Sequence, residues 1–189
     1  MTVPQTPESL AGRLLLAMPD MPDARFRRSV IGICIHDEGG ALGIALGEPV
    51  DGLGLQELLE SFDIDGSGVG NEPVLAGGPM EPRRGFVLHS TDWTAEDSVI
   101  IAENLVLTGS LDVLRAIGAG QGPRDYLVAL GYAGWGSGQL ERELAAPGWF
   151  LSTLSPRGLF DVTPANRWAA AFAGEGIDPA MLAATSGEA

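Results

Sequence analysis

Short aliphatic runs separated by glycine- and proline-rich turns dominate the chain, and this pattern predicts many short strands. Turns are expected at 77–79, at 82–85 and in the glycine-rich stretch after residue 130. The runs that predict strands are 14–18, 30–35, 42–46, 74–76, 86–88, 99–101, 105–107, 126–130 and 149–151.

Helices are predicted where apolar residues recur at helical spacing. The leucines at 55, 58 and 59, followed by Phe62, mark one face of a short amphipathic helix. Ser110 is expected to cap a helix over 111–117, and a further helix is expected over 138–145. Residues 163–164 and 178–179 each place proline after an N-cap residue, which predicts two helices near the end of the chain.

Neither an internal repeat nor a break in composition divides the chain. We therefore expect a single α/β (α+β) domain over residues 12–182, with a flexible N-terminal arm at 1–11 and a flexible tail at 183–189. Hairpin-like neighbours and helical crossovers both occur, so the sheet is expected to be mixed.

The 189 residues carry a formal net charge of −14, from 25 acidic residues against 11 basic ones, and every basic residue is arginine. Without lysine the chain cannot form a Schiff base, as pyridoxal phosphate enzymes do, and it lacks the amine of a Walker-type phosphate loop. No cofactor is expected. The acidic balance also opposes broad capture of DNA, RNA or an anionic membrane.

The compartment follows from three features. Residues 1–9 lack the positive charge of a secretion signal, and no apolar run approaches the about 20 residues of a spanning helix. Cys34 is the only cysteine, so no disulfide can form within one chain. These features predict a cytoplasmic protein without a membrane segment.

Residues 63–68, Asp-Ile-Asp-Gly-Ser-Gly, match the start of a calcium-binding EF-hand loop. The loop needs a bidentate glutamate at position 12, where this chain has Val74. Glu72 lies at position 10, where its reach and angle are wrong. We therefore expect an ordinary Asp/Gly turn and no metal site.

Period-two alternation in the strand 30–35 places Cys34 and His36 on one face and three isoleucines on the other. Together with His89, at the end of another strand, they could form a thiol–base pair or a three-ligand metal site. The alternative is a buried apolar cysteine and two hydrogen-bonded histidines that connect elements. We favour the alternative and keep His89 as a candidate ligand contact.

The segment 131–141, Gly-Tyr-Ala-Gly-Trp-Gly-Ser-Gly-Gln-Leu-Glu, is the densest unusual stretch. As a turn between a strand and a helix, its free backbone N–H groups between Gly134 and Gly138 would suit an anion or a polar ligand. Tyr132 and Trp135 could supply stacking faces, with Ser137 beside them. Alternatively, the glycines only let the backbone turn, while Trp135 packs as an anchor and Ser137 caps the helix.

Two groups of arginines complete the candidate chemistry. Arg25, Arg27 and Arg28 form one group, and Arg83 with Arg84 forms the other. Either group could hold a phosphate or a carboxylate through forked hydrogen bonds. In so acidic a chain, pairing with nearby acids on a solvated face is the favoured interpretation.

With these segments placed, the chain resembles the AlgH/YqgE-like family of bacterial proteins. The resemblance implies a single cytosolic domain whose mixed, partly barrel-like β-sheet is flanked by short helices, and relatives carry the provisional label of transcriptional regulators. Gly-Glu-Pro at 47–49 and Pro-Gly at 147–148 depart from the family pattern. The matching stretches include Leu-Ala-Met-Pro at 16–19, Phe-Arg-Arg-Ser-Val at 26–30, Gly-Gly-Pro at 77–79, Arg-Gly-Phe-Val-Leu-His-Ser at 84–90, the run 129–140 and Arg-Trp at 167–168.

Two functions of different class remain open. The first is a non-enzymatic regulatory or interaction protein that binds a protein or a small molecule, without direct DNA contact, and the lack of a recognisable catalytic set favours it. The second is an enzyme or sensor that holds a small anionic ligand at 134–138, which requires the arginines and this loop to meet in one concave pocket. The candidate ligand contacts are Arg83, Arg84, His89, Tyr132, Trp135 and Ser137.

Overall fold

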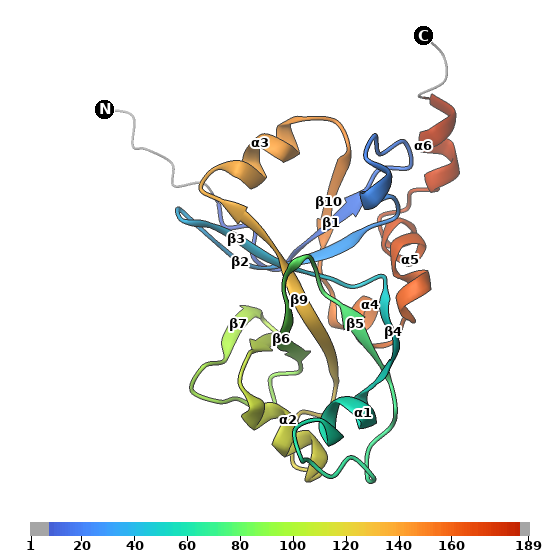
Figure 1. Ribbon diagram of the computed structural model, residues 1–189. Coiled ribbons are helices and arrows are strands. Elements are labelled where there is room, and N and C mark those ends of the chain that lie inside the picture. Colours follow the sequence, from blue (N-terminus) through green and yellow to red (C-terminus); the bar gives the residue numbers. More distant parts are fainter. Residues whose placement is uncertain (1–7, 186–189) are drawn as a thin grey trace.

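The computed structural model describes residues 8–185, in which ten strands form one sheet flanked by short helices (Figure 1). Residues 1–7 of the expected arm and 186–189 of the expected tail lie outside the described residues. The strands are β1 Arg13–Ala17, β2 Val30–Asp37, β3 Gly40–Ala45, β4 Pro49–Gly54, β5 Pro73–Ala76, β6 Met80–His89, β7 Val99–Ala102, β8 Leu105–Thr108, β9 Tyr126–Gly136 and β10 Trp149–Thr153. The helices are α1 Leu55–Glu60, α2 Leu111–Gly118, α3 Gln139–Ala145, α4 Pro156–Phe160, α5 Arg167–Gly174 and α6 Pro179–Thr185, with 3₁₀ turns at Ala24–Phe26 and Pro164–Asn166.

Strand β9 lies near the middle of the sheet and joins two parts of it, one made of β10, β1, β2 and β3 and the other of β6, β8 and β7 (Figure 1). The order is β10-β1-β2-β3-β9-β6-β8-β7, and these neighbours pair antiparallel. Strand β5 adds to β9 as a parallel neighbour and pairs with β4 on its other side. The sheet is therefore mixed and curls into a half-barrel within a single α/β domain, which confirms the expected fold class.

Strand β9 changes its pairing partners beside three glycines, Gly77, Gly78 and Gly131, which we name the glycine crossing. Residues 126–130 of β9 pair with β5 and β6, whereas 133–136 pair with β3. Gly77 links the two parts, since its N–H donates to the Leu130 carbonyl and its carbonyl accepts from Ala45, each at 2.8 Å. A Cβ on Gly131, whose φ is +76°, would lie 2.4 Å from the Gly78 carbonyl oxygen. Only glycine allows the chains to cross this closely.

Three apolar clusters fill the domain. The largest lies inside the curl of the sheet, where Leu16, Leu88 and Phe172 are buried and where α4 and α5 close one side. A second cluster seats α1 and α2 against β5, β6 and the first half of β9. The third lies under α3, around Ile33 and Trp135. No helix within residues 8–185 has the length and apolar character that crossing a membrane requires.

A β-bulge in β2 overturns the expected alternation. Ile33 pairs with Gly43, but Ile35 pairs with Leu42, so Cys34 is an extra residue in the strand. Cys34 and Ile35 both turn into the central cluster, and His36 turns to the other side, toward α3. The prediction that Cys34 and His36 share a face is therefore wrong, because one inserted residue reverses the alternation.

Two predicted turns are also wrong. The stretch after residue 130 continues as strand to Gly136, because glycines can follow an extended path where neighbouring chains approach closely. Residues 82–85 lie inside β6, where a register shift between Met80 and Gly85 accommodates the proline. Strand β4 and helix α4 were not predicted, because their short segments carry little apolar periodicity.

Candidate functional site

Trp135, in the glycine-rich segment, is an anchor beneath α3. Its side chain packs with Ile33 and Leu140, and the residue is 9% exposed. The indole Nε1 donates to Glu143 Oε2 at 2.9 Å. One strand residue is thereby fixed to the helix that follows it, which agrees with the anchor interpretation of Trp135.

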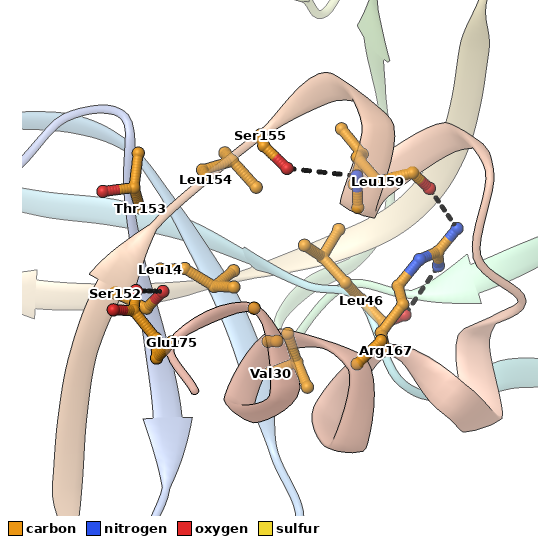
Figure 2. A pocket seen from close by; sticks show the side chains of 14 residues that line it. Leu14, Val30, Leu46, Ser152, Thr153, Leu154, Ser155, Leu159, Arg167 and Glu175 are labelled. Atoms are coloured by element: carbon orange, nitrogen blue, oxygen red, sulfur yellow. Dashed lines mark hydrogen bonds between the residues drawn. The ribbon is translucent and has the colours of Figure 1, made fainter. Parts of the chain in front are cut away.

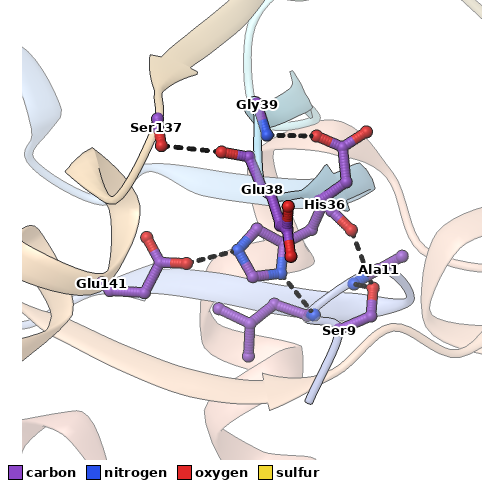
Figure 3. A network of polar contacts seen from close by, with 9 residues as sticks. Ser9, Ala11, His36, Glu38, Gly39, Ser137 and Glu141 are labelled. Carbon is purple, nitrogen blue, oxygen red and sulfur yellow. Dashed lines mark hydrogen bonds and ion pairs between the residues drawn. The ribbon is translucent and has the colours of Figure 1, made fainter. Parts of the chain in front are cut away.

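Two further polar groups of this segment also have protein partners. The N–H of Gly136 donates to Gln139 Oε1 at 3.0 Å. Ser137 Oγ donates to the Glu38 carbonyl at 2.7 Å, as Figure 3 shows, and the N-cap residue of α3 is Gly138. Ser137 therefore ties the β2–β3 turn and does not cap the helix. A ligand at 134–138 stays a prediction from the sequence.

Arg84 and Tyr132 form one surface cluster with Glu81 and Phe86. Arg84 Nη1 pairs with Glu81 Oε2 at 3.2 Å, and its guanidinium carbon lies 5.1 Å from the centre of the Phe86 ring. The rings of Phe86 and Tyr132 meet edge-on with their centres 5.8 Å apart. A hydrogen bond with Glu81 raises the pKa of Tyr132. The cation of this cluster is therefore already paired, while Arg83 is exposed beside it on β6.

A shallow hollow of about 540 Å³ lies over the glycine-rich strands. Its walls include Tyr132, Gly134 and Trp135, and neither Arg83 nor Arg84 lines it. The arginine group at 25–28 is engaged elsewhere, since Arg25 pairs with Asp23 at 2.6 Å and the guanidinium carbon of Arg28 lies 5.0 Å from the centre of the Trp168 ring.

His89 is completely buried at the end of β6. Its Nδ1 lies 2.8 Å from the Ser90 carbonyl, and its Nε2 lies 2.8 Å from Thr108 Oγ1, which in turn lies 2.7 Å from Ser98 Oγ. Burial lowers the pKa of His89 and favours the neutral ring, which donates from Nδ1 and accepts at Nε2. His89 thus connects β6 and β8 to the loop between β6 and β7.

His36 connects the start of the described chain to α3 (Figure 3). Its Nδ1 accepts from the Leu10 N–H at 2.9 Å, so Nε2 carries the proton and donates to Glu141 Oε1 at 2.7 Å. Ser9 Oγ donates to the His36 carbonyl at 3.1 Å. A hydrogen bond from its own backbone, followed by the one with His36, lowers the pKa of Glu141. The segment just before β1 is therefore fastened to β2.

Cys34 and the two histidines do not assemble into one site. Cys34 is buried in the central cluster, and burial raises the pKa of its thiol to about 12. His36 lies on the opposite side of the sheet, and His89 spends both ring nitrogens on protein partners. Within the part of the chain that the structure describes, no three His, Cys, Asp or Glu side chains are placed to hold a metal ion.

Two cavities that share a wall were not predicted from the sequence. Cavity A, of about 240 Å³, lies between β1, β2, β10, α4 and α5, and Figure 2 shows the side chains around it. Cavity B, also of about 240 Å³, lies between α1, β5, β9 and the segment from α4 to α5. Leu159 and Arg167 line both cavities.

Arg167 is the polar centre of this region. It is 8% exposed, and its Nη1 and Nη2 donate to the carbonyls of Leu46 and Leu159, each at 2.7 Å. Its Nε has no hydrogen-bond partner, and no carboxylate pairs with it among residues 8–185. Burial lowers the pKa of Arg167 to about 10, so the side chain remains charged at neutral pH. The feature of the sequence that could have pointed to Arg167 was its position next to Trp168 inside a predicted helix.

The curled mixed sheet and the preformed cavities beside a buried arginine define a single-domain α/β protein of the half-barrel type. A family model described as AlgH-like matches residues 14–180. The chain belongs to this AlgH-like family, which confirms the resemblance seen in the sequence.

The relatives extend over nearly the whole chain. A UPF0301 protein of Rhizorhabdus wittichii is 52% identical over 97% of this chain and 98% of its own length. The solution structure of the AlgH protein from Pseudomonas aeruginosa is 36% identical, covers 100% of both chains and has a TM-score of 0.76. A crystal structure from Corynebacterium diphtheriae, 19% identical over 94% of this chain and 93% of its own, has a TM-score of 0.75 and shows the fold alone. These names state a family and no activity.

Proposed function

We propose that this protein is a non-enzymatic regulatory protein of the cytoplasm, which binds a small ligand beneath α4 and α5 and passes the occupancy of that site to a macromolecular partner. The observation that carries the proposal is the pair of cavities that meet at Arg167. A preformed, mostly apolar space with a few polar groups on its wall is the usual form of a small-molecule site.

The chemistry of the titratable side chains supports binding over catalysis. The Cys34 thiol is buried and its pKa is raised, so the thiolate needed for nucleophilic attack is scarce near neutral pH. His36 and His89 have protein partners at both ring nitrogens. Direct DNA contact is not part of the proposal, since Arg25 and Arg84 are each paired with an acid and the net charge is −14.

A fragment screen on the full chain, observed through the protein's NMR signals, tests this proposal. Fragments are expected to shift the amide signals of 152–159 and 170–175, which surround cavity A, and to leave those of 134–138 unchanged. Ala171→Leu is the matched control, because Ala171 lines cavity A and a larger apolar side chain fills the space. Fragments that bind only over 134–138, or that bind the Ala171→Leu variant equally well, would overturn the proposal.

A further inference from the structure

Arg167 is an uncompensated charge inside the domain. A buried guanidinium is normally neutralised by a carboxylate, because an ion that leaves water without a counter-ion costs several kcal/mol. This chain has 25 acidic residues, yet within residues 8–185 the hydrogen bonds of Arg167 go to two neutral carbonyls and no carboxylate pairs with it. A guanidinium has five N–H donors, and two are used in these bonds. The protein therefore keeps a cation in its interior with unused donors, including Nε.

The charges around the two cavities favour cavity A as the place for an anion. Cavity B is flanked by Glu72 and Asp161, both exposed at its walls, and these would repel an anion. Cavity A has one acid among its lining residues, Glu175, whose carboxylate accepts a hydrogen bond from Ser152. Figure 2 shows this pair at the end of cavity A away from Arg167.

The rest of the lining of cavity A is mostly aliphatic, apart from Thr153 and Ser155. Leu14, Val30, Leu46 and Leu154 line it, and Figure 2 shows them between Arg167 and the Ser152–Glu175 pair. A space of about 240 Å³ is below the about 300–1,000 Å³ typical of drug-sized ligands, so it suits a small molecule. Its volume and chemistry thus match a short chain with one charged end.

We propose that cavity A binds a short aliphatic carboxylate, whose carboxylate group accepts from Arg167 and whose chain lies against Leu14, Val30 and Leu154. This inference rests on the proposed function, since it names the ligand class of that same site. The ligand carboxylate supplies the missing counter-ion, and its hydrogen bonds with the Arg167 guanidinium are charge-assisted. Burial strengthens these bonds because little water competes. The aliphatic chain contributes through the apolar surface it buries.

Octanoate and 1-octanol form the matched pair of probes that tests the inference, because they share chain length and differ in charge. Isothermal titration of the wild-type chain is expected to give at least a tenfold lower Kd for octanoate. The ¹⁵N and ¹H signals of Arg167 Nε should shift with octanoate and stay in place with 1-octanol. Inorganic phosphate, an anion without an aliphatic chain, is expected to bind at least tenfold more weakly than octanoate.

Two arginine variants separate charge from fold. Arg167→Gln is expected to remove the preference for octanoate and to leave the Kd of 1-octanol within about twofold, while near-UV circular dichroism reports on the native packing of Trp168. Arg157→Gln, which changes an exposed arginine on α4, should leave both Kd values unchanged. Because the wild-type comparison needs no variant, a poorly folded Arg167→Gln does not prevent the test.

The outcomes distinguish the inference from the proposed function. Equal affinity for both probes, unchanged in Arg167→Gln, would overturn the anion inference and leave a neutral apolar ligand as the function of cavity A. Phosphate binding as tightly as octanoate would also overturn it. If neither fragments nor either probe bind beneath α4 and α5, both proposals fail, and Arg167 is a structural link between Leu46 and Leu159.

Discussion

The glycine crossing and the surroundings of Arg167 differ in how completely protein atoms fill the interior. At the crossing, backbone meets backbone, and a Cβ on Gly77 or Gly131 would lie 2.3 and 2.4 Å from a neighbouring oxygen. Around Arg167, two cavities of about 240 Å³ remain, and the buried Nε–H has no partner among residues 8–185. The first region has no room for a ligand, whereas the second keeps open space beside a buried cation. The three glycines of the crossing therefore serve to build the sheet.

The largest expected effect is at the glycine crossing. Gly131→Ala forces a left-handed φ of +76° on a residue whose Cβ would overlap Gly78, so we expect a loss of about 3 kcal/mol or more in the free energy of unfolding. Gly68→Ala is the control, because nothing lies within 4 Å of its Cβ position, and it should change stability by less than about 0.5 kcal/mol. Urea denaturation measures both. Equal stability of the two variants would show that the backbone at the glycine crossing can shift to admit a Cβ. It would then contradict the difference drawn between the crossing and the surroundings of Arg167.

Arg167→Met should have an intermediate effect on stability. The variant orphans the carbonyls of Leu46 and Leu159, but it also removes a desolvated charge, and water in the cavities can reach the freed groups. We expect a net loss of about 1–2 kcal/mol in urea denaturation without ligand. Arg157→Met, at an exposed position, should be neutral. A loss as large as that of Gly131→Ala would mean that Arg167 mainly holds the fold together.

The smallest expected effect concerns His89, a buried titratable group whose ring nitrogens are both bonded. Burial lowers its pKa below the ordinary 6.5, so the unfolded chain takes up a proton first as the pH falls. Its contribution to stability is therefore complete above about pH 6.5 and is lost as the pH falls toward the folded-state pKa, with a slope of at most about 1.4 kcal/mol per pH unit.

Thermal unfolding between pH 7.5 and 5.5 measures this dependence. His89→Gln should unfold with a smaller loss of stability over the range than the wild type, whatever its stability at pH 7.5. If stability depended on pH equally in His89→Gln and the wild type, the loss of stability at acid pH would come from the carboxylates and not from His89. The result sharpens the contrast with Arg167, whose pKa of about 10 leaves it charged in the interior at every pH in this range.

Local pattern predicted much of the fold, because most strands and helices here bury one regular stripe of apolar residues. It failed at Cys34, where one inserted residue reverses the faces of β2, since a bulge depends on the partner strand and leaves no mark in the alternation. It also failed after residue 130, where glycines continue a strand through its pairing with β3 and β6. The curl of the sheet was predicted by the family resemblance alone.

The cavities were beyond sequence reasoning for a physical reason. Leu14 and Val30 come from early strands, Leu154 follows β10, and Arg167 begins α5, so cavity A exists only once distant segments meet. An arginine at a helix start is ordinarily a solvated residue. What distinguishes Arg167 is that it is buried while no carboxylate pairs with it among residues 8–185, and this combination is visible only in the folded chain.

The position of β9 in the chain also determines when the strands can pair during synthesis on the ribosome. Strands β3 and β6 both border β9, which is completed only at Gly136, and β1 waits for β10 at 149–153. At typical synthesis rates the nascent chain therefore carries unpaired strand edges for on the order of ten seconds. Such edges can pair with other strands, so the growing polypeptide is open to association with other chains until β9 and β10 are complete.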